Sequence, residues 1–81
     1  MNEPKGIDEM SQTTVTSIDE FPAPFNKQIK LEEVVYDNDF KLLRIRIREG
    51  KRFTTMELDA DTARKWGGLM LEWAEANSPV A

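Results

Sequence analysis

Apolar and basic residues alternate strictly through the middle of the chain. The apolar positions are Leu43, Ile45 and Ile47, and the basic positions are Arg44, Arg46 and Arg48. Successive side chains of a strand point to opposite faces, so a period of two residues indicates a strand. The pattern therefore predicts a strand over residues 40–48 with one apolar face and one basic face.

A short turn after this strand predicts how it pairs with the next one. In the sequence EGKR at residues 49–52, Gly50 stands at the first central position, which suits a type II′ hairpin turn. The turn leads into a strand over residues 52–58 and places Ile45 opposite Met56. A slip of one residue would mix apolar and polar side chains on both faces, so this register is well specified.

A preceding strand is predicted over residues 27–36. Apolar and polar residues alternate at its start, but Val34 breaks the phase. We predict a β-bulge at Glu32-Glu33, which would return Val34 to the apolar face. The sequence Asp-Asn-Asp at residues 37–39 favours a turn into the next strand.

The last strand leads into an amphipathic helix that Asp59 caps and Pro79 prevents from continuing. Residues at helical spacing form one stripe: Ala63, Trp66, Gly67, Met70, Trp73 and Ala74. This stripe predicts that the helix packs on the apolar face of the sheet. Leu69 and Leu71 widen the stripe beyond what a three-stranded sheet covers, so we expect a homodimer.

These elements predict an α+β fold, with an antiparallel three- to four-stranded sheet packed on one C-terminal helix. Residues 1–20 are rich in Ser, Thr, Glu and Asp, so we predict a disordered acidic tail there and a single small domain over residues 21–81. The β-propensity of residues 13–18 leaves a short edge strand as the alternative. The Pro22–Phe25 segment is either an ordered lead-in to the domain or an exposed peptide that docks elsewhere.

The 81 residues contain no His and no Cys, which removes the commonest general base, nucleophile and metal ligands. Neighbouring acidic residues are explained by turns and a helix cap, so we expect no enzyme activity, no metal site and no cofactor. No apolar run approaches the ~20 residues of a membrane-spanning helix. The acidic N-terminus does not resemble a secretory signal, so we expect a cytoplasmic protein.

The net charge of −4 is concentrated in residues 1–26, which carry five acidic residues and one lysine. The remainder of the chain has equal numbers of acidic and basic residues. The acidic composition therefore does not exclude a basic surface on the domain.

The row of arginines is the strongest functional candidate. Alternate residues lie about 7 Å apart along a strand, and the predicted register places Phe53 beside the row. Basic groups that track phosphates, together with aromatic rings that stack on bases, are typical of single-stranded nucleic-acid binding. The candidate nucleic-acid-binding residues are Arg44, Arg46, Arg48, Lys51, Arg52, Phe53 and Tyr36.

We therefore expect weak, largely sequence-independent binding of single-stranded nucleic acid on the open sheet face. Two alternatives use the same residues. The arginines can form ordinary cross-strand pairs on a solvated face, as Arg44 would with Glu57. The domain can also be a protein-interaction module, because an acidic protein partner is attracted to arginine as well.

Two stretches resemble the positive cofactor four family of transcriptional coactivators: LLRIRIRE in the central strand and FTTMELDADTARKW at the entry to the helix. The resemblance covers about residues 25–75 and lies in the pattern of apolar positions. It implies a curved antiparallel sheet followed by one helix, dimerisation through the helix region, and binding of single-stranded DNA on the sheet. The loop at residues 49–52 is shorter than the basic loop usual in that family.

Overall fold

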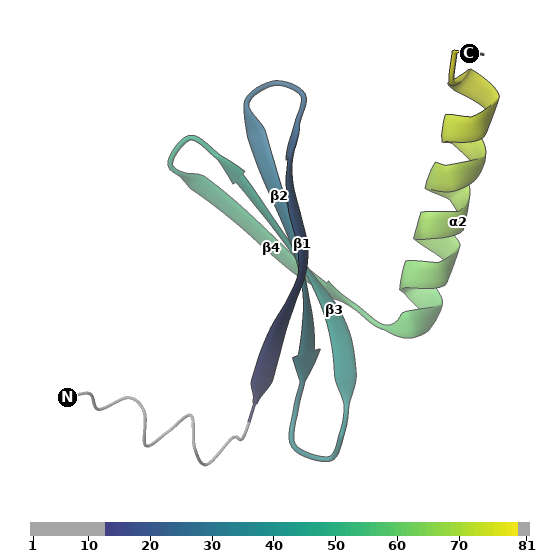
Figure 1. Ribbon diagram of the computed structural model, residues 1–81. Coiled ribbons are helices and arrows are strands. Elements are labelled where there is room, and N and C mark those ends of the chain that lie inside the picture. Colours follow the sequence, from purple (N-terminus) through teal and green to yellow (C-terminus); the bar gives the residue numbers. More distant parts are fainter. Residues whose placement is uncertain (1–12, 80–81) are drawn as a thin grey trace.

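The computed structural model describes residues 13–79 as a four-stranded antiparallel sheet followed by one C-terminal helix (Figure 1). The elements are β1 (Thr14–Ala23), β2 (Lys27–Val35), β3 (Lys41–Glu49), β4 (Arg52–Leu58) and α2 (Ala60–Asn77). Each strand pairs with the next along the chain, in the order β1-β2-β3-β4. The predicted α+β class and antiparallel sheet are confirmed.

The β3–β4 hairpin has the register that the alternation predicts. Ile45 pairs with Met56, and Arg48 pairs with Phe53. Gly50 has a φ of 62°, and no other residue of this turn has a positive φ, as a type II′ turn requires. One face of the sheet, the arginine face, carries Arg44, Arg46 and Arg48. The opposite, apolar face carries Ile29, Leu31, Leu43, Ile45, Ile47, Met56 and Leu58.

Strand β2 has no bulge, so the prediction at Glu32-Glu33 was wrong. Its register with β3 is continuous and places Glu33 opposite Leu43, and Val34 opposite Leu42. Val34 is fully buried, and its partner on β1 is Val15. A short apolar row therefore crosses the arginine face. The bulge was predicted on the assumption that all apolar side chains share one face, and this row shows that they do not.

Strand β1 lies in a part of the chain where composition predicts a tail. Residues 14–20 pair with β2, which corrects the prediction of disorder for this stretch. Its backbone groups bond to a strand elsewhere in the chain, and composition carries no information about such a partner. The register shifts between Ser17 and Asp19, which marks a β-bulge in this edge strand. The rest of the predicted tail, residues 1–12, lies outside the described residues.

Helix α2 begins where the sequence predicts, with Asp59 as its N-cap. The Asp59 carboxylate accepts a hydrogen bond from the backbone N–H of Thr62 at 2.9 Å. Hydrogen bonding from the Thr62 side chain, and then from this backbone N–H, lowers the pKa of Asp59, because it stabilises the charged form of the carboxyl group. The cap therefore links the stability of the helix to pH.

Because the pKa of Asp59 is lowered on folding, its contribution to stability is complete above the unfolded-state value of about 4. The contribution is lost as the pH falls through the lower value of the folded state. We expect Asp59→Asn to lose this part of the acid sensitivity, since Asn caps a helix without titrating. Thermal melts of both proteins, followed by circular dichroism at acidic and neutral pH, measure the difference. An identical pH dependence would contradict a role for the charged cap.

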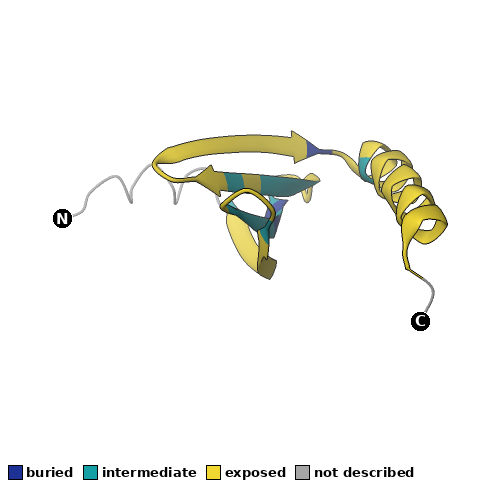
Figure 2. Cartoon of the chain, turned by 90° about the horizontal axis from the view of Figure 1, so that it is seen from above, coloured by how far each residue is buried: buried dark blue, intermediate teal, exposed yellow. Residues whose placement is uncertain are grey.

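No residue of α2 is buried, so the predicted packing of the helix stripe on the sheet was wrong for the single chain. Trp66 is 41% exposed and Trp73 is 69% exposed. The helix stands to one side of the sheet and joins it at the end of β4 (Figure 1), and it is exposed along nearly its whole length (Figure 2). Among residues 13–79, the buried apolar side chains are Val34 and Leu58. The single chain thus leaves the helix stripe uncovered.

Candidate nucleic-acid interface

The arginine face is built from three cross-strand rows that span β2, β3 and β4. Strand register defines them as Glu32–Arg44–Glu57, Lys30–Arg46–Thr55 and Gln28–Arg48–Phe53. The first row has two carboxylates beside its arginine, and the other two have none. The three arginines therefore have different surroundings, although they alternate regularly in sequence.

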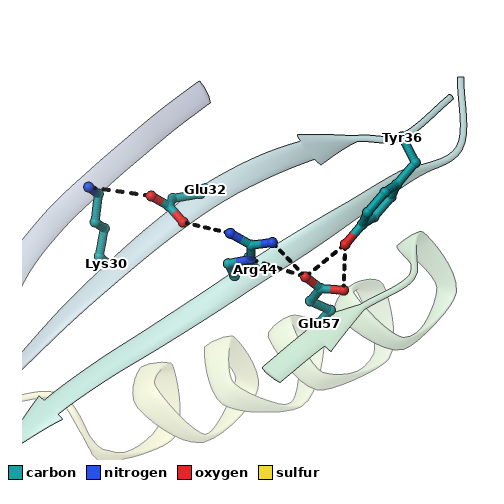
Figure 3. Close-up of polar contacts among 5 residues, drawn as sticks. All are labelled: Lys30, Glu32, Tyr36, Arg44 and Glu57. Carbon is teal, nitrogen blue, oxygen red and sulfur yellow. Dashed lines mark hydrogen bonds and ion pairs between the residues drawn. The ribbon is translucent and has the colours of Figure 1, made fainter. Parts of the chain in front are cut away.

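Arg44 is ion-paired with both glutamates of its own row (Figure 3). Arg44 donates to Oε2 of Glu57 from Nε at 3.0 Å and from Nη2 at 2.9 Å, and its Nη1 lies 3.8 Å from Oε1 of Glu32. The Tyr36 hydroxyl lies 3.0 Å from each carboxylate oxygen of Glu57. The hydrogen bonds with Glu57 are the main cause that raises the pKa of Arg44. Arg44 and Tyr36, both predicted to bind nucleic acid, are thus held by Glu57.

Glu32 completes this network from within the sheet. It is only 5% exposed, and its Oε2 lies 3.3 Å from Nζ of Lys30. Its Oε1 accepts no hydrogen bond within the described part of the chain. A buried carboxylate needs compensating charge, which Lys30 and Arg44 supply. The formal charges of these residues and Glu57 cancel, so this end of the arginine face has little attraction for phosphate.

The other end of the arginine face is open and cationic. Arg46 and Arg48 are exposed and form no ion pair within residues 13–79. They line a shallow pocket of about 180 Å³ together with Glu20, Gln28, Lys30 and Phe53. The ring of Phe53 is 62% exposed. Glu20 lies on β1 and Phe53 on β4, so the sheet curves enough for both of its edge strands to line one pocket.

Lys51 and Arg52, which were also predicted to contact phosphate, do not lie with Arg46 and Arg48 on the arginine face. Arg52 pairs with Glu49 at the end of the hairpin and alternates with Phe53, so it belongs to the apolar face. Lys51 is exposed in the turn itself. The structure therefore brings Arg46, Arg48 and Phe53 together and separates Arg52 from them.

Three residues of the pocket were not predicted from the sequence. Gln28 and Lys30 occupy alternate positions of β2, and a continuous register with β3 places them beside Arg48 and Arg46. That alternation was the available signal. Glu20 falls in the stretch that composition assigns to a tail, so no local signal indicated its position.

Within the described residues, no three acidic side chains lie close enough together to hold a metal ion. In the same part of the chain, helix α2 lacks the long apolar sequence that a membrane-spanning helix needs.

Comparison with protein families places the chain in one of them. A model described as "Family of unknown function (DUF6967)" matches residues 12–76. The chain belongs to this family. The matched region contains all four strands and almost the whole of α2. No curated protein and no solved structure matches the chain, and the family match to DUF6967 does not assign it to the positive cofactor four family.

Proposed function

We propose that this DUF6967 protein binds single-stranded nucleic acid on its arginine face, weakly and largely independently of sequence, as a homodimer. The observation that carries the proposal is the pocket in which Arg46, Arg48 and Lys30 lie with the exposed ring of Phe53. Proteins that bind single strands combine cations that follow the backbone with rings on which bases stack. The open end of the arginine face offers both.

Each residue of the pocket has a role in this binding mode. Arg46 and Arg48 contact phosphates, because neither forms an ion pair within the described chain. Lys30 contributes less, since it is also paired with a buried carboxylate. Phe53 stacks on a base. Glu20 is the acidic residue of the lining and lies on β1, so a phosphate is expected over β3 instead.

The size of the pocket favours part of a polymer over a complete small molecule. Its volume of about 180 Å³ is below the ~300–1,000 Å³ of sites that enclose whole ligands. A base can stack on Phe53 only when it is free of its own helix, which favours a single strand over a duplex. Phosphate contacts carry no base information, so the binding is expected to be largely independent of sequence.

The homodimer is proposed from the apolar surface that the single chain leaves uncovered. The helix exposes Trp66 and Trp73. A groove of about 430 Å³ near the start of α2 is lined by Ile18, Leu43 and Leu58, among others. Extended apolar surface of this kind marks an interaction site, and a small domain can enlarge its core by association. In a homodimer, the exposed helix and groove of each copy would cover those of the other.

The resemblance to the positive cofactor four family agrees with both parts of the proposal. It implies a curved antiparallel sheet followed by one helix, and the described residues have this order of elements. Domains of that family dimerise and bind single-stranded DNA on the sheet. A shared arrangement of elements does not define function by itself, so the proposal rests on the pocket and its unpaired cations.

The second candidate function is a protein-interaction module without catalytic activity. The cations of the pocket would accept the carboxylates of an acidic protein as readily as phosphates. The exposed side chains of Leu69 and Leu71 on α2 favour this alternative, because they add apolar contact area. The two candidates differ in ligand, since an acidic peptide has no base to stack on Phe53.

Titration of the ¹⁵N-labelled protein at low salt distinguishes the two candidates. The ligand is an oligothymidylate of about eight nucleotides, within the site sizes of single-strand binding domains. We expect resonances of Arg46, Arg48 and Phe53 to shift, and those of Ile45 and Met56 on the apolar face to stay in place. An oligoglutamate peptide of the same charge is the control. If only the peptide shifts the arginine face, the nucleic-acid proposal is wrong.

A further inference from the structure

The turn between β1 and β2 places both Phe25 and Asn26 in the left-handed region, a position that favours Gly or Asn over a bulky aromatic residue such as Phe25. Its side chain is 85% exposed in the turn between β1 and β2. Its φ of 65° lies in the left-handed region, which a bulky side chain rarely adopts. The ring has one described neighbour, the ammonium of Lys27, whose Nζ lies 5.8 Å from the ring centroid. An aromatic ring held in solvent at a cost in backbone strain is a candidate for binding.

The two residues that follow Phe25 in the chain, Asn26 and Lys27, line a second pocket at the end of the sheet. This pocket has a volume of about 120 Å³ and is lined by Asn26, Lys27, Gln28, Arg48 and Gly50. Asn26 is the next residue after Phe25, and Lys27 is the cation beside its ring. The β1–β2 turn and the β3–β4 turn that surround it lie at the same end of the sheet (Figure 1).

The two pockets are neighbours because they share residues. Gln28 and Arg48 line both the 180 Å³ pocket with Phe53 and the 120 Å³ pocket at the turns. A polar and cationic path therefore runs from Phe53, across Arg48, toward Phe25. In the other direction the arginine face ends at the neutral network around Arg44. Electrostatic attraction therefore favours a polyanion that extends from Phe53 toward Phe25 over one that extends toward Arg44.

We propose that Phe25 is a second base-stacking residue, and that a single strand runs from Phe53 over Arg48 and Gln28 to Phe25. This inference rests on the proposed function and extends its site. The strand leaves the sheet over the two hairpin turns, and its phosphate contact is Arg48, because the ammonium of Lys27 beside Phe25 is paired with Glu49 at 3.5 Å. The chain then offers two stacking platforms with a phosphate-binding arginine between them.

The variant Phe25→Gly separates binding from folding. Glycine adopts a positive φ without strain, so the thermal unfolding midpoint is expected to stay unchanged or to rise. Loss of the ring should weaken binding of an oligothymidylate of about eight nucleotides by about 5- to 150-fold, the usual range for one stacked base. Phe25→Trp should restore binding or strengthen it. Fluorescence anisotropy at low salt measures all three proteins.

Phe40→Ala is the matched control. Phe40 is also exposed and aromatic, but it lies at the opposite end of the sheet, where its ring centroid is 6.2 Å from that of Tyr36. Its removal should leave the affinity within about twofold of wild type, since surface changes away from a contact have effects within about 0.5 kcal/mol.

The outcomes distinguish this inference from the proposed function. If Phe53→Ala weakens binding and Phe25→Gly does not, the proposed function stands and the second platform is refuted. If no variant and no wild-type protein binds the oligonucleotide, the proposed function itself has failed. If Phe25→Gly changes the oligomeric state measured by sedimentation, Phe25 belongs to a protein interface and the inference is overturned.

Discussion

The thermal unfolding midpoint of this protein is expected to rise with protein concentration. Among residues 13–79, the buried apolar side chains are Val34 and Leu58, and a core this small predicts marginal stability for the single chain. If a second copy covers the exposed helix and the groove at its base, folding and association become one process. Each tenfold rise in concentration then adds about 1.4 kcal/mol to the apparent stability. Sedimentation equilibrium should show a dimer under the same conditions.

Trp66→Ala tests whether the helix stripe forms the missing core. Truncation of a fully buried tryptophan costs about 3–5 kcal/mol, enough to unfold a marginal domain. In the single chain Trp66 is 41% exposed, so the same change would cost considerably less without a partner. Glu72→Ala, also on α2, is the control and should melt like wild type. A midpoint independent of concentration, combined with wild-type melting of Trp66→Ala, would show that the chain is stable alone.

The parts of the fold that sequence predicts correctly are those that neighbouring residues determine. The β3–β4 register follows from a two-residue turn and strict alternation, so Ile45 could be placed opposite Met56. The start of α2 follows from Asp59 and the hydrogen bond it accepts from Thr62. In both cases the interacting groups lie within one hairpin or one helical turn.

The parts that sequence misses depend on distant segments. The β-propensity of residues 13–18 allowed an edge strand as the alternative, but strand β1 forms because β2 provides a pairing edge, which the sequence of β1 does not reveal. The stripe on α2 predicts that Trp66 and Trp73 pack against another apolar surface, but an apolar pattern does not state whether that surface belongs to the same chain. The structure of the single chain leaves both side chains exposed, which directs attention to a second copy.

In the candidate binding site, too, local contacts were predictable and contacts with distant segments were not. The pairing of Arg48 with Phe53 was predictable from the hairpin, and so was the Arg44–Glu57 pair. Glu32 joins that pair only in the continuous register of β2, which the predicted bulge disrupted. Without this register Arg44 has Glu57 as its one carboxylate neighbour. With it, Arg44 is held by two carboxylates and the other two arginines remain available.

Replacement of Arg46 and Arg48 together by Gln is expected to weaken nucleic-acid binding strongly and leave the fold unchanged. Both side chains are exposed, and no ion pair within the described chain depends on them. Each phosphate contact to a single strand contributes about −0.7 to the slope of log affinity against log salt. Contacts from these arginines and Lys30 give a slope near −2 for the wild type, and the variant should lose about 1.4 of it. Anisotropy titrations at several salt concentrations measure the slope.

Arg44→Gln is the control from the same strand and the same face. We expect it to lower the stability of the fold and to leave nucleic-acid binding nearly unchanged, the opposite of the Arg46 and Arg48 replacement. Arg44→Gln removes the cation between Glu32 and Glu57 and leaves a buried carboxylate with Lys30 as its remaining partner. We expect it to destabilise the fold by about 1.5–3 kcal/mol, the range for hydrogen bonds to charged groups. The affinity of the folded protein and its salt slope should change little, because Arg44 is engaged by Glu57. If the Arg44→Gln variant folds normally but fails to bind, Arg44 must leave Glu57 and contact the ligand. The distinction between a paired Arg44 and the available Arg46 and Arg48 would then be wrong.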